Sequence, residues 1–443
     1  MSRTAIASMF RACLFSLLLA PLALAQPTVS VQPLGALAVE VDGERAALEP
    51  HRAAAYGDGF VILATLADRP FGAPNPLVVL ALDAGGAVTG HRVLDSLGAV
   101  LGAPTRMQPF GAALVFAVHV NGVGAPVKII ALEGLEAREV LSVPTDTSSG
   151  VETTGSVDVG YGSRITSTGF RLTDAVPLAQ DLFLVTGQST QEVSVASSTD
   201  LAAGSLGEAD RVSAPRAVLV NTRGESRPLA VEARGSHGEV MGAAANSGQI
   251  LTVYWTGGDA YSSDATVAAA FDAQFGLTDG FSVERPSDRF AEVYPWGEGF
   301  LLYGARGSDT ARGDGGPSRL TLTVVGGRPA SGARSAQDVD IGQDLPREGA
   351  ALWFQPAFVG TLDGQGVLAV AALARLGENG AVESRRAYLG RLGNGPADRW
   401  ELTTGTEAYD VRPLALHPGG ALLTAHQSEY GAPWRLELAR LSD

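Results

Sequence analysis

Nine residues with ionisable or aromatic side chains recur near the start of short apolar segments along the chain. Acids and arginines that meet around one opening bind a polar ligand or a peptide terminus through charge-assisted hydrogen bonds. Two of the acids at a suitable separation would instead serve as the acid and base of glycoside hydrolysis. The simpler interpretation is that these side chains pair with one another and with water. The candidates are His51, Arg52, Arg106, Asp174, Glu239, Glu292, Trp353, Asp410 and Arg412.

The sequence has none of the usual signatures of a nucleophile, a metal site or a phosphate-binding loop. It contains no GxSxG elbow, no HExxH motif and no GxGxxG turn between a strand and a helix. A GxxxxGK[ST] loop is excluded because the only lysine, Lys128, follows Val127 in an apolar run. The six histidines form no HxH or HxxxH pair. We therefore expect neither a metal nor a cofactor.

The elements that must position these residues are short strands, seen most clearly between His51 and Leu94. This stretch contains four strand-length runs, HRAAAY, FVILATLA, PLVVLALD and AVTGHRVL, which are separated by glycine turns or a loop. The two middle runs are apolar almost throughout, which is typical of strands covered on both faces. A four-stranded sheet of this kind must lie between other sheets.

Weaker copies of the second of these strands recur to the C-terminus, about 60 residues apart on average. No helical periodicity follows the first 25 residues. Repeated units of this kind predict an all-β chain that folds as a seven-bladed β-propeller with four-stranded antiparallel blades. The second strands begin near Phe60, Ala112, Leu182, Ile250, Phe300, Val367 and Ala421.

An N-terminal strand is predicted to close this ring. The last unit stops after its third strand, and a strand over Ala36–Gly43 precedes the first unit and would complete that blade. Two alternatives stay open. An insertion in the third unit, Gln188–Ala214, would allow eight blades, and a pair of β-sandwiches would also accommodate many short strands.

The turns within several units point to a family of repeats. The segments ALHPGGALLTAH, TLDGQGVLAV and YPWGEGFLLYG are similar to the P-D-G turn of TolB-like propeller repeats. No unit ends in Trp-Asp, and the segment Ser262–Thr266 lacks the glycine and tryptophan of the sialidase box S-x-D-x-G-x-x-W. The resemblance implies a propeller architecture and no specific functional family.

Residues 1–25 are typical of a secretory signal peptide. Arg3 and Arg11 flank the start, an apolar run follows, and Ala23-Leu24-Ala25 forms a small-residue cleavage site. The apolar run is too short to span a bilayer, so we expect no membrane span. We expect export to the periplasm or the medium, and one propeller domain over residues 26–443. Because Cys13 is the only cysteine, this domain lacks disulfides and depends on a large core.

The formal net charge of −15 bears on the partners of the protein. An acidic surface repels nucleic acid and anionic membranes on average. We therefore expect no nucleic-acid partner. We expect a monomer that binds a protein or a glycan whose identity the sequence does not specify.

The connections between strands are unequal on the two faces of the predicted ring. Turns between first and second strands are tight, whereas the second-to-third connections and the connections between units are long. Long loops on a rigid scaffold usually carry binding or catalytic residues. The long connections span Leu66–Asn75, Thr145–Gly169, Gln188–Ala214, Gly304–Pro317, Gln337–Gly349 and Gly377–Ser384.

These observations favour a secreted binding or scaffolding module whose binding face is formed by the long loops and the nine candidate residues. The alternative is a propeller hydrolase or lyase that acts on a polysaccharide, with two of Asp174, Glu239, Glu292 and Asp410 as acid and base. A third hypothesis is a ring with a purely structural role.

Overall fold

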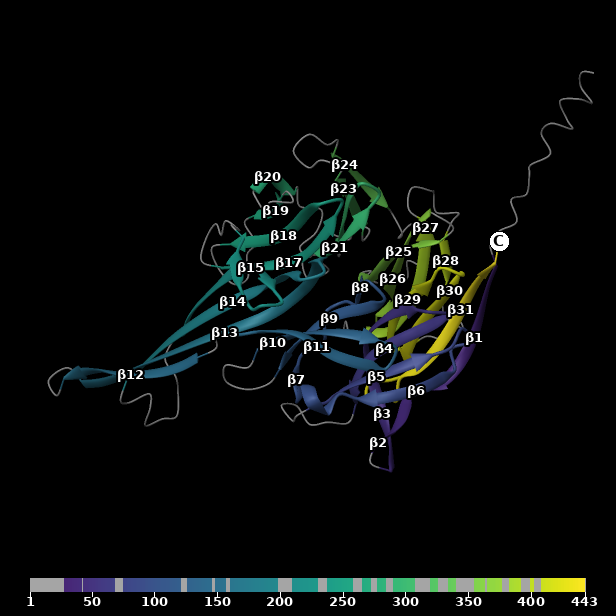
Figure 1. The fold of residues 1–443 in the computed structure, drawn as a ribbon, viewed down its shortest axis with the longest axis horizontal. Coiled ribbons are helices and arrows are strands. Elements are labelled where there is room, and N and C mark those ends of the chain that lie inside the picture. The colour runs from purple at the N-terminus through teal and green to yellow at the C-terminus, as the bar shows by residue number, and fades with distance from the viewer. Residues whose placement is uncertain are drawn as a thin grey trace, which may run out of the picture.

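The computed structural model consists almost entirely of β-strands, arranged around a ring (Figure 1). In the part of the chain that the structure describes, the helical content is one 3-10 turn, η1 (Asp95–Leu97), and no helix is long and apolar enough to cross a membrane. The described residues, which exclude the predicted signal peptide, are 28–41, 43–67, 75–120, 126–145, 148–156, 160–197, 209–229, 237–257, 265–271, 277–283, 290–306, 319–325, 334–339, 354–362, 365–376, 382–391, 399–401 and 408–442.

The described strands form seven antiparallel sheets, which we number in the order in which the chain enters them. In each sheet, strands that follow one another in the chain are paired side by side, except for the first two strands of sheet 2, which both pair with the third. Sheet 1 contains β2 (Ala38–Val41), β3 (Glu44–Tyr56), β4 (Gly59–Leu66), β5 (Leu77–Leu82) and β6 (Val88–Val93). Sheet 2 contains β7 (Val100–Leu101), β8 (Gln108–Phe110), β9 (Ala113–Val120), β10 (Val127–Glu133) and β11 (Glu136–Val143). Sheet 3 contains β12 (Ser148–Ser156), β13 (Gly160–Ala179), β14 (Leu182–Ser197), β15 (Ala209–Asn221) and β16 (Ser226–Pro228).

The remaining sheets have four strands each. Sheet 4 contains β17 (His237–Asn246), β18 (Gln249–Gly257), β19 (Ala265–Phe271) and β20 (Leu277–Val283). Sheet 5 contains β21 (Phe290–Trp296), β22 (Gly299–Arg306), β23 (Arg319–Val325) and β24 (Arg334–Val339). Sheet 6 contains β25 (Phe354–Leu362), β26 (Gln365–Leu376), β27 (Val382–Arg391) and β28 (Arg399–Glu401). Sheet 7 contains β29 (Asp410–His417), β30 (Ala421–Gln427), β31 (Arg435–Ser442) and, from the other end of the chain, β1 (Thr28–Ala36).

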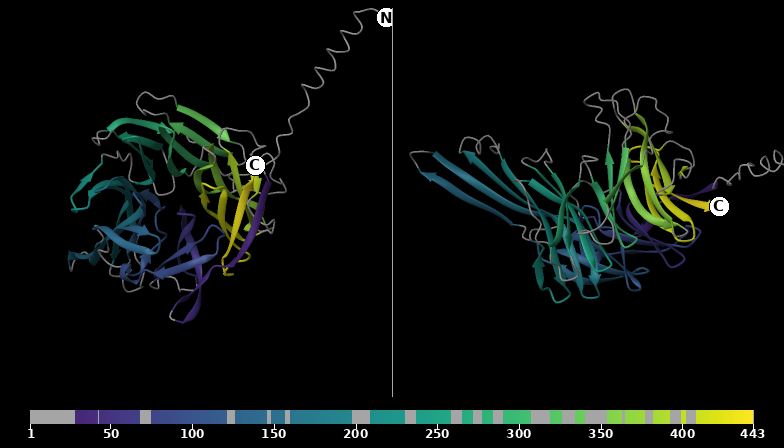
Figure 2. Two further views of the ribbon diagram at one scale, coloured as in Figure 1. Left: turned by 45° about the vertical axis from the view of Figure 1, so that its right-hand side comes forward. Right: turned by 90° about the horizontal axis from the view of Figure 1, so that it is seen from above.

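Each sheet packs on its neighbour in the chain, and the last packs on the first. Separate apolar cores join sheets 7 and 1, 1 and 2, 2 and 3, 3 and 4, 4 and 5, and 6 and 7, and strands β22 and β25 connect sheets 5 and 6. Phe60, Phe116, Phe183 and Phe300, which lie near the centres of four second strands or at their starts, are almost completely buried. This cyclic packing, visible in Figure 2, is the architecture of a β-propeller. The count of seven blades and the resemblance to TolB-like repeats stay predictions.

The second strands begin within two residues of the predicted positions, from β4 at Gly59 to β30 at Ala421. This agreement has a local cause, because these runs are the most continuously apolar segments of the chain. In β4 every residue is buried, since the strand is covered on both faces.

An N-terminal strand does complete the last sheet, but the predicted strand over Ala36–Gly43 was wrong. The strand that pairs with β31 is β1, which ends at Ala36. At Leu37 the chain passes from sheet 7 to sheet 1, where the Leu37 N–H donates to the Trp434 carbonyl at 2.7 Å. The following strand, β2, folds back on β3 with Val41 opposite Glu44. Residues 38–41 therefore belong to sheet 1 and not to sheet 7.

Two of the predicted long loops are strands. In Thr145–Gly169 and Gln188–Ala214 the described residues other than Thr145 belong to β12, β13, β14 and β15, which continue sheet 3 beyond the ring on the left of Figure 1. We call this extension the arm, defined as residues 148–156, 160–168, 189–197 and 209–214. Its serine-rich composition suggested loops, but threonine and valine favour strands, and pairing satisfies the backbone. The insertion therefore extends sheet 3 and does not form a separate sheet.

Candidate functional site

The first strands of neighbouring sheets contact one another around the centre of the ring. In the described residues, six of these strands have a register shift, which is the mark of a β-bulge. A bulge changes the direction in which nearby side chains point, so it affects the residues that follow the shift. Arg52, Asp174 and Glu292 each occupy the first paired position after the shift. The shifts lie at Pro50/Arg52, Leu172/Asp174, Val240/Gly242, Phe290/Glu292, Pro356/Phe358 and Pro413/Ala415.

In sheet 2 the corresponding strand is divided into β7 and β8, and Arg106 lies in the segment between them. Its guanidinium contacts three other sheets. It forms an ion pair with Asp174 at 3.0 Å between Nη2 and Oδ2, and Nη1 donates to the Val293 carbonyl at 2.6 Å. Nη2 also donates to the Ala243 carbonyl. The guanidinium carbon lies 5.1 Å from the centre of the Tyr294 ring. One arginine thus ties sheet 2 to sheets 3, 4 and 5.

The carboxylate of Asp174 is buried, with 8% of the side chain exposed. Its second oxygen accepts hydrogen bonds from the Ala175 N–H at 2.9 Å and from Gln108 Nε2 at 3.4 Å. Gln108 Nε2 also donates to the Ala175 carbonyl at 3.0 Å. Both oxygens of this carboxylate are therefore engaged by protein groups, and a cation neutralises its charge.

A second arginine, Arg412 of sheet 7, lies across the seam with sheet 1. Its Nη2 contacts Glu49 Oε1 at 3.0 Å and Asp410 Oδ2 at 3.5 Å, and its Nη1 donates to the Pro50 carbonyl at 2.7 Å. The guanidinium also stacks on Trp434, at 4.3 Å from the ring centre. The predicted residues Asp410 and Arg412 therefore lie together, as Arg106 and Asp174 do in the other cluster.

His51 is the extra residue in the bulge of β3, and its Nε2 lies 2.8 Å from Thr65 Oγ1. Burial lowers the pKa of His51 from 6.5 to about 4. The Glu49 carboxylate acts in the opposite direction, and the charges of Arg412 and Arg52 lower the pKa further. His51 is therefore neutral at pH 7 and is poorly suited to exchange protons there.

The other predicted residues, Arg52, Glu239, Glu292 and Trp353, have fewer described contacts with the two clusters. Arg52 donates through Nε to the Pro104 carbonyl at 3.3 Å, which links sheet 1 to sheet 2. The backbones of Glu239 and Glu292 belong to β17 and β21, two neighbouring first strands. Trp353 lies outside the described residues. The structure therefore gathers the described side chains into two clusters, around Arg106 and around Arg412, with His51 and Arg52 beside the second.

Sequence reasoning missed several members of these clusters. Glu49 lies two residues before His51, and Gln108 lies two residues after Arg106, so both are close in sequence to a predicted residue. Tyr294 follows Val293 on the same strand, and its ring lies against the Arg106 guanidinium. The partnership of Trp434 with Arg412 had no local signal.

A buried acid outside the two clusters was also missed. Glu437 on β31 is 2% exposed, and its Oε1 lies 3.6 Å from Nδ1 of His426 on β30. Burial lowers the pKa of His426, and Glu437 opposes this effect. Within the described ranges, no group of three or more histidines, cysteines and acids is placed to hold a metal ion.

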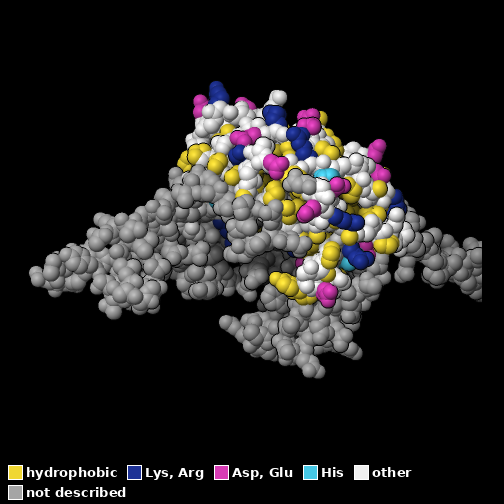
Figure 3. Space-filling model, turned by 90° about the horizontal axis from the view of Figure 1, so that it is seen from below, with side chains coloured by type: hydrophobic (Ala, Val, Ile, Leu, Met, Phe, Trp, Pro, Cys, Tyr) yellow, Lys and Arg dark blue, Asp and Glu magenta, His cyan; other side chains and the backbone are white. Residues whose placement is uncertain are grey.

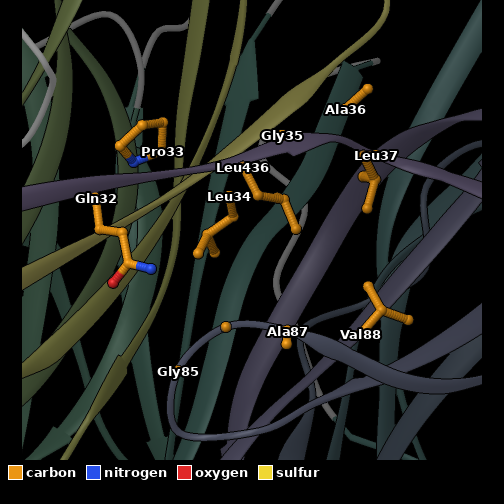
Figure 4. Close-up of a pocket in the computed structure, with 11 residues that line it drawn as sticks. Gln32, Pro33, Leu34, Gly35, Ala36, Leu37, Gly85, Ala87, Val88 and Leu436 are labelled. Carbon is orange, nitrogen blue, oxygen red and sulfur yellow. The ribbon is translucent and has the colours of Figure 1, made fainter.

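A shallow pocket of about 270 Å³ lies apart from both clusters, where the bulge of β1 meets the turn between β5 and β6. Its lining is largely small or apolar and includes Leu34, Leu37, Val88 and Leu436 (Figure 4). Leu34 packs so closely on Gly86 that a Cβ there would lie 2.3 Å from Leu34 Cδ1. The pocket therefore belongs to the seam at which the ring closes.

On the face shown in Figure 3, acidic, basic and apolar side chains of the described residues are interspersed. They do not gather into a patch of one sign on this face.

No family model matches the chain, and no curated protein matches it. Solved structures similar to it include the β-propeller domain of the Trilobed protease from Pyrococcus furiosus, with 10% identity, a TM-score of 0.41, and coverage of 90% of this chain and 98% of that domain. Pyrococcus horikoshii acylaminoacyl peptidase has 13% identity, a TM-score of 0.40 and coverage of 90% and 52%. Trypanosoma rangeli sialidase with sialic acid has 10% identity, a TM-score of 0.37 and coverage of 82% and 56%.

The chain thus spans little more than half of the peptidase and sialidase chains. With TM-scores this low, these likenesses carry no argument about activity or ligand. The propeller architecture of this protein rests on its own sheets and their cyclic packing.

Proposed function

We propose that this protein is an exported propeller module that binds a protein or glycan partner through the arm and the long connections on the same face. The observation that carries the proposal is the arm itself. Two predicted loops of one unit are ordered as strands that continue sheet 3 beyond the ring. An extension that adds nothing to the closure of the ring offers a rigid contact surface to a partner.

The two arginine clusters support binding over hydrolysis in this proposal. A hydrolytic pair needs one carboxyl group that is protonated and another that faces the scissile bond. Asp174 Oδ2 lies 3.0 Å from Arg106 Nη2, and Asp410 Oδ2 lies 3.5 Å from Arg412 Nη2. Both arginines also donate to backbone carbonyls of neighbouring sheets. These acids have a sufficient role in holding the sheets together.

The test compares three forms of the protein in affinity capture from envelope fractions and culture medium. In the arm-shortened form, residues 148–168 and 189–214 are each replaced by an Asn-Gly turn. The cut ends are adjacent because Ser148 lies opposite Thr168 and Ser189 lies opposite Ala214. In the matched central form, the arm is intact and Glu292 and Asp410 are replaced by glutamine and asparagine.

We expect the parent and the central form to retain the same partner and the arm-shortened form to lose it. The melting curves of all three forms are the control for folding. Loss of the partner by the central form alone would move the binding site to the centre of the ring and overturn the role of the arm. Release of reducing sugar from a polysaccharide by the parent, abolished in the central form, would favour the hydrolase.

A further inference from the structure

The loop between β30 and β31 exposes an aromatic side chain to solvent. Among the described residues, the large apolar side chains that are strongly exposed are Val88, at 47%, and Tyr430, at 85%. The ring of Tyr430 contacts the ring of Tyr409, with 5.9 Å between the ring centres and an angle of 75° between the ring planes. This edge-on contact supports the Tyr430 ring, and the high exposure means that at least one face of the ring is open.

The backbone of this loop holds Tyr430 in position. The Ala432 N–H donates to the Glu429 carbonyl at 3.1 Å, and Gly431 has a φ of 80°. These features define a type II turn with Tyr430 at its second position, and glycine suits the positive φ of the third. Gln427 Nε2 also donates to the Ala432 carbonyl at 2.6 Å. Because the turn is ordered before a ligand binds, little conformational freedom is lost when the ring is covered.

Polar side chains of the Arg412 cluster lie close to this aromatic pair. Tyr409 and Arg412 are three residues apart, so their backbones are separated by no more than about 11 Å. Arg412 contacts Glu49 Oε1 at 3.0 Å, and the Glu49 side chain is 39% exposed. Within the described part of the chain, the other carboxylate oxygen, Oε2, has no hydrogen-bond partner. A ligand hydroxyl can donate to it in a charge-assisted hydrogen bond.

We propose that Tyr430 is the stacking platform of a binding site for a neutral oligosaccharide, and that Glu49 accepts hydrogen bonds from hydroxyl groups of the same ligand. A sugar ring has an apolar face that packs on an aromatic ring, and the hydroxyl groups at its edge need hydrogen-bond partners. The Tyr430 ring and the Glu49 carboxylate supply both. Because they are separated along the seam, a chain of sugars fits the site better than a single sugar.

The charge of the protein favours a neutral sugar over other ligands that stack. A nucleic-acid base also stacks on tyrosine. However, Glu429 lies beside Tyr430 in the chain, and the net charge is −15. Both oppose the phosphates of a nucleic acid and the carboxylates of an acidic sugar.

The surroundings of Tyr430 favour a sugar over a protein. A protein partner usually covers about 800 Å² on each side, and the centre of the contact is apolar. The residues that flank Tyr430 in its turn are Glu429, Gly431 and Ala432, which are charged or small. A single exposed ring with such neighbours is sufficient for stacking on a sugar and does not form an apolar centre.

Fluorine NMR of the mature chain, labelled with fluorinated tyrosine, tests the site directly. The sequence contains nine tyrosines, so the signals of Tyr430 and Tyr409 can be assigned with Tyr→Phe variants. The probes are soluble oligosaccharides of cellulose, starch and chitin, together with the neutral polysaccharide fraction of the envelope and medium of the source organism. An oligogalacturonate is the acidic counterpart.

We expect a neutral probe to shift the Tyr430 signal until it saturates, and the acidic probe to leave it unchanged. Calorimetry then compares the variants. Tyr430→Ala should raise the dissociation constant about tenfold or more, whereas Tyr430→Phe keeps the ring and should stay within about threefold of the parent. The matched control, Val88→Ala, shortens the other exposed apolar side chain and should bind like the parent. Glu49→Gln should weaken binding without abolishing the shift of the Tyr430 signal.

The inference is overturned if no neutral probe shifts the Tyr430 signal, if Tyr430→Ala and Val88→Ala bind equally well, or if the acidic probe binds in place of the neutral ones. Capture of a protein that depends on Tyr430, without sugar binding, would assign this ring to a protein interface instead. Melting curves check that the variants fold, which the exposure of Tyr430 leads us to expect.

This site is formed by sheets 7 and 1 and is separate from the arm, so the inference goes beyond the proposed function. The arm-shortened form should still bind the neutral probe, and Tyr430→Ala should still retain the partner of the arm. Either proposal can therefore fail while the other stands.

Discussion

At the centre of the ring, the single side chain of Arg106 holds together sheets that are joined elsewhere by apolar cores. The first strands converge there, and β17 and β21 each lie at an edge of their sheet, so that carbonyls on their open side have no ladder partner. A guanidinium has five donors in a planar fork, so it can bind a carboxylate and two carbonyls on different strands at once. Arg412 binds two carboxylates and one carbonyl at the seam between sheets 7 and 1. At the scale of the residue, the arginines hold sheets together.

Replacing Arg106 by alanine should therefore destabilise the protein strongly. The change would leave the buried Asp174 without its ion pair and two carbonyls without their donor. Breaking such a buried pair costs about 3 to 5 kcal/mol. We expect Arg106→Lys to recover only part of this loss, because an ammonium cannot reach three sheets. Urea unfolding measures both.

The control is the double variant Arg106→Ala with Asp174→Asn. It should be more stable than Arg106→Ala alone, because no unpaired charge remains in the interior. A loss below about 1 kcal/mol for Arg106→Ala would show that the pair behaves like an exposed ion pair.

The lowered pKa of His51 predicts a pH dependence of stability. Between pH 6.5 and about 4 the unfolded chain binds a proton at His51 and the folded chain does not. Stability from this residue is therefore fully present above pH 6.5 and is lost as the pH falls through this window. Allowing for partial exposure, the loss is on the order of 2 kcal/mol.

His51→Gln keeps a polar group near Thr65 and cannot titrate. Urea unfolding at several pH values should show a smaller fall in stability between pH 6.5 and 4 for the variant than for the parent. Acids elsewhere titrate equally in both, so the difference isolates His51. Parallel curves would contradict the burial of this imidazole.

At the scale of the element, strands are recognisable in the sequence and their partners are not. The runs from Phe60 and Ala421 are mostly apolar, so their identity and bounds follow from local composition. The arm was missed because β12 and the outer part of β13 have the serine, threonine and glycine content of a loop. Such a segment becomes a strand only when a partner satisfies its backbone, and pairing of Ser148 with Thr168 supplies that partner.

At the scale of the whole molecule, closure of the ring joins the two ends of the chain. Strand β1 pairs with β31, so residues about four hundred positions apart are adjacent, as in Val29 opposite Leu441. Without β1 the last sheet would lose its outer strand and expose a new edge on β31. The apolar core between sheets 7 and 1 also depends on this seam.

A chain that begins at Leu37 should consequently unfold several degrees below one that begins at Thr28. Both forms lack the predicted signal peptide, so the comparison isolates β1. Adding the peptide TVSVQPLGA should raise the melting temperature of the shorter chain, whereas a scrambled peptide should not. Equal melting temperatures for the two chains would show that the seam is stable without β1.

The sequence by itself determined the repeated strands, the all-β architecture and the types of residue at the starts of the units. These depend on periodicity and composition within a few tens of residues. The tertiary structure alone decided that Arg106 meets Asp174, that Arg412 meets Glu49, that β1 and not residues 36–43 closes the ring, and that two loops form an arm. Each of these depends on which strands pair and pack across the ring, and such long-range pairing leaves no local pattern in the chain.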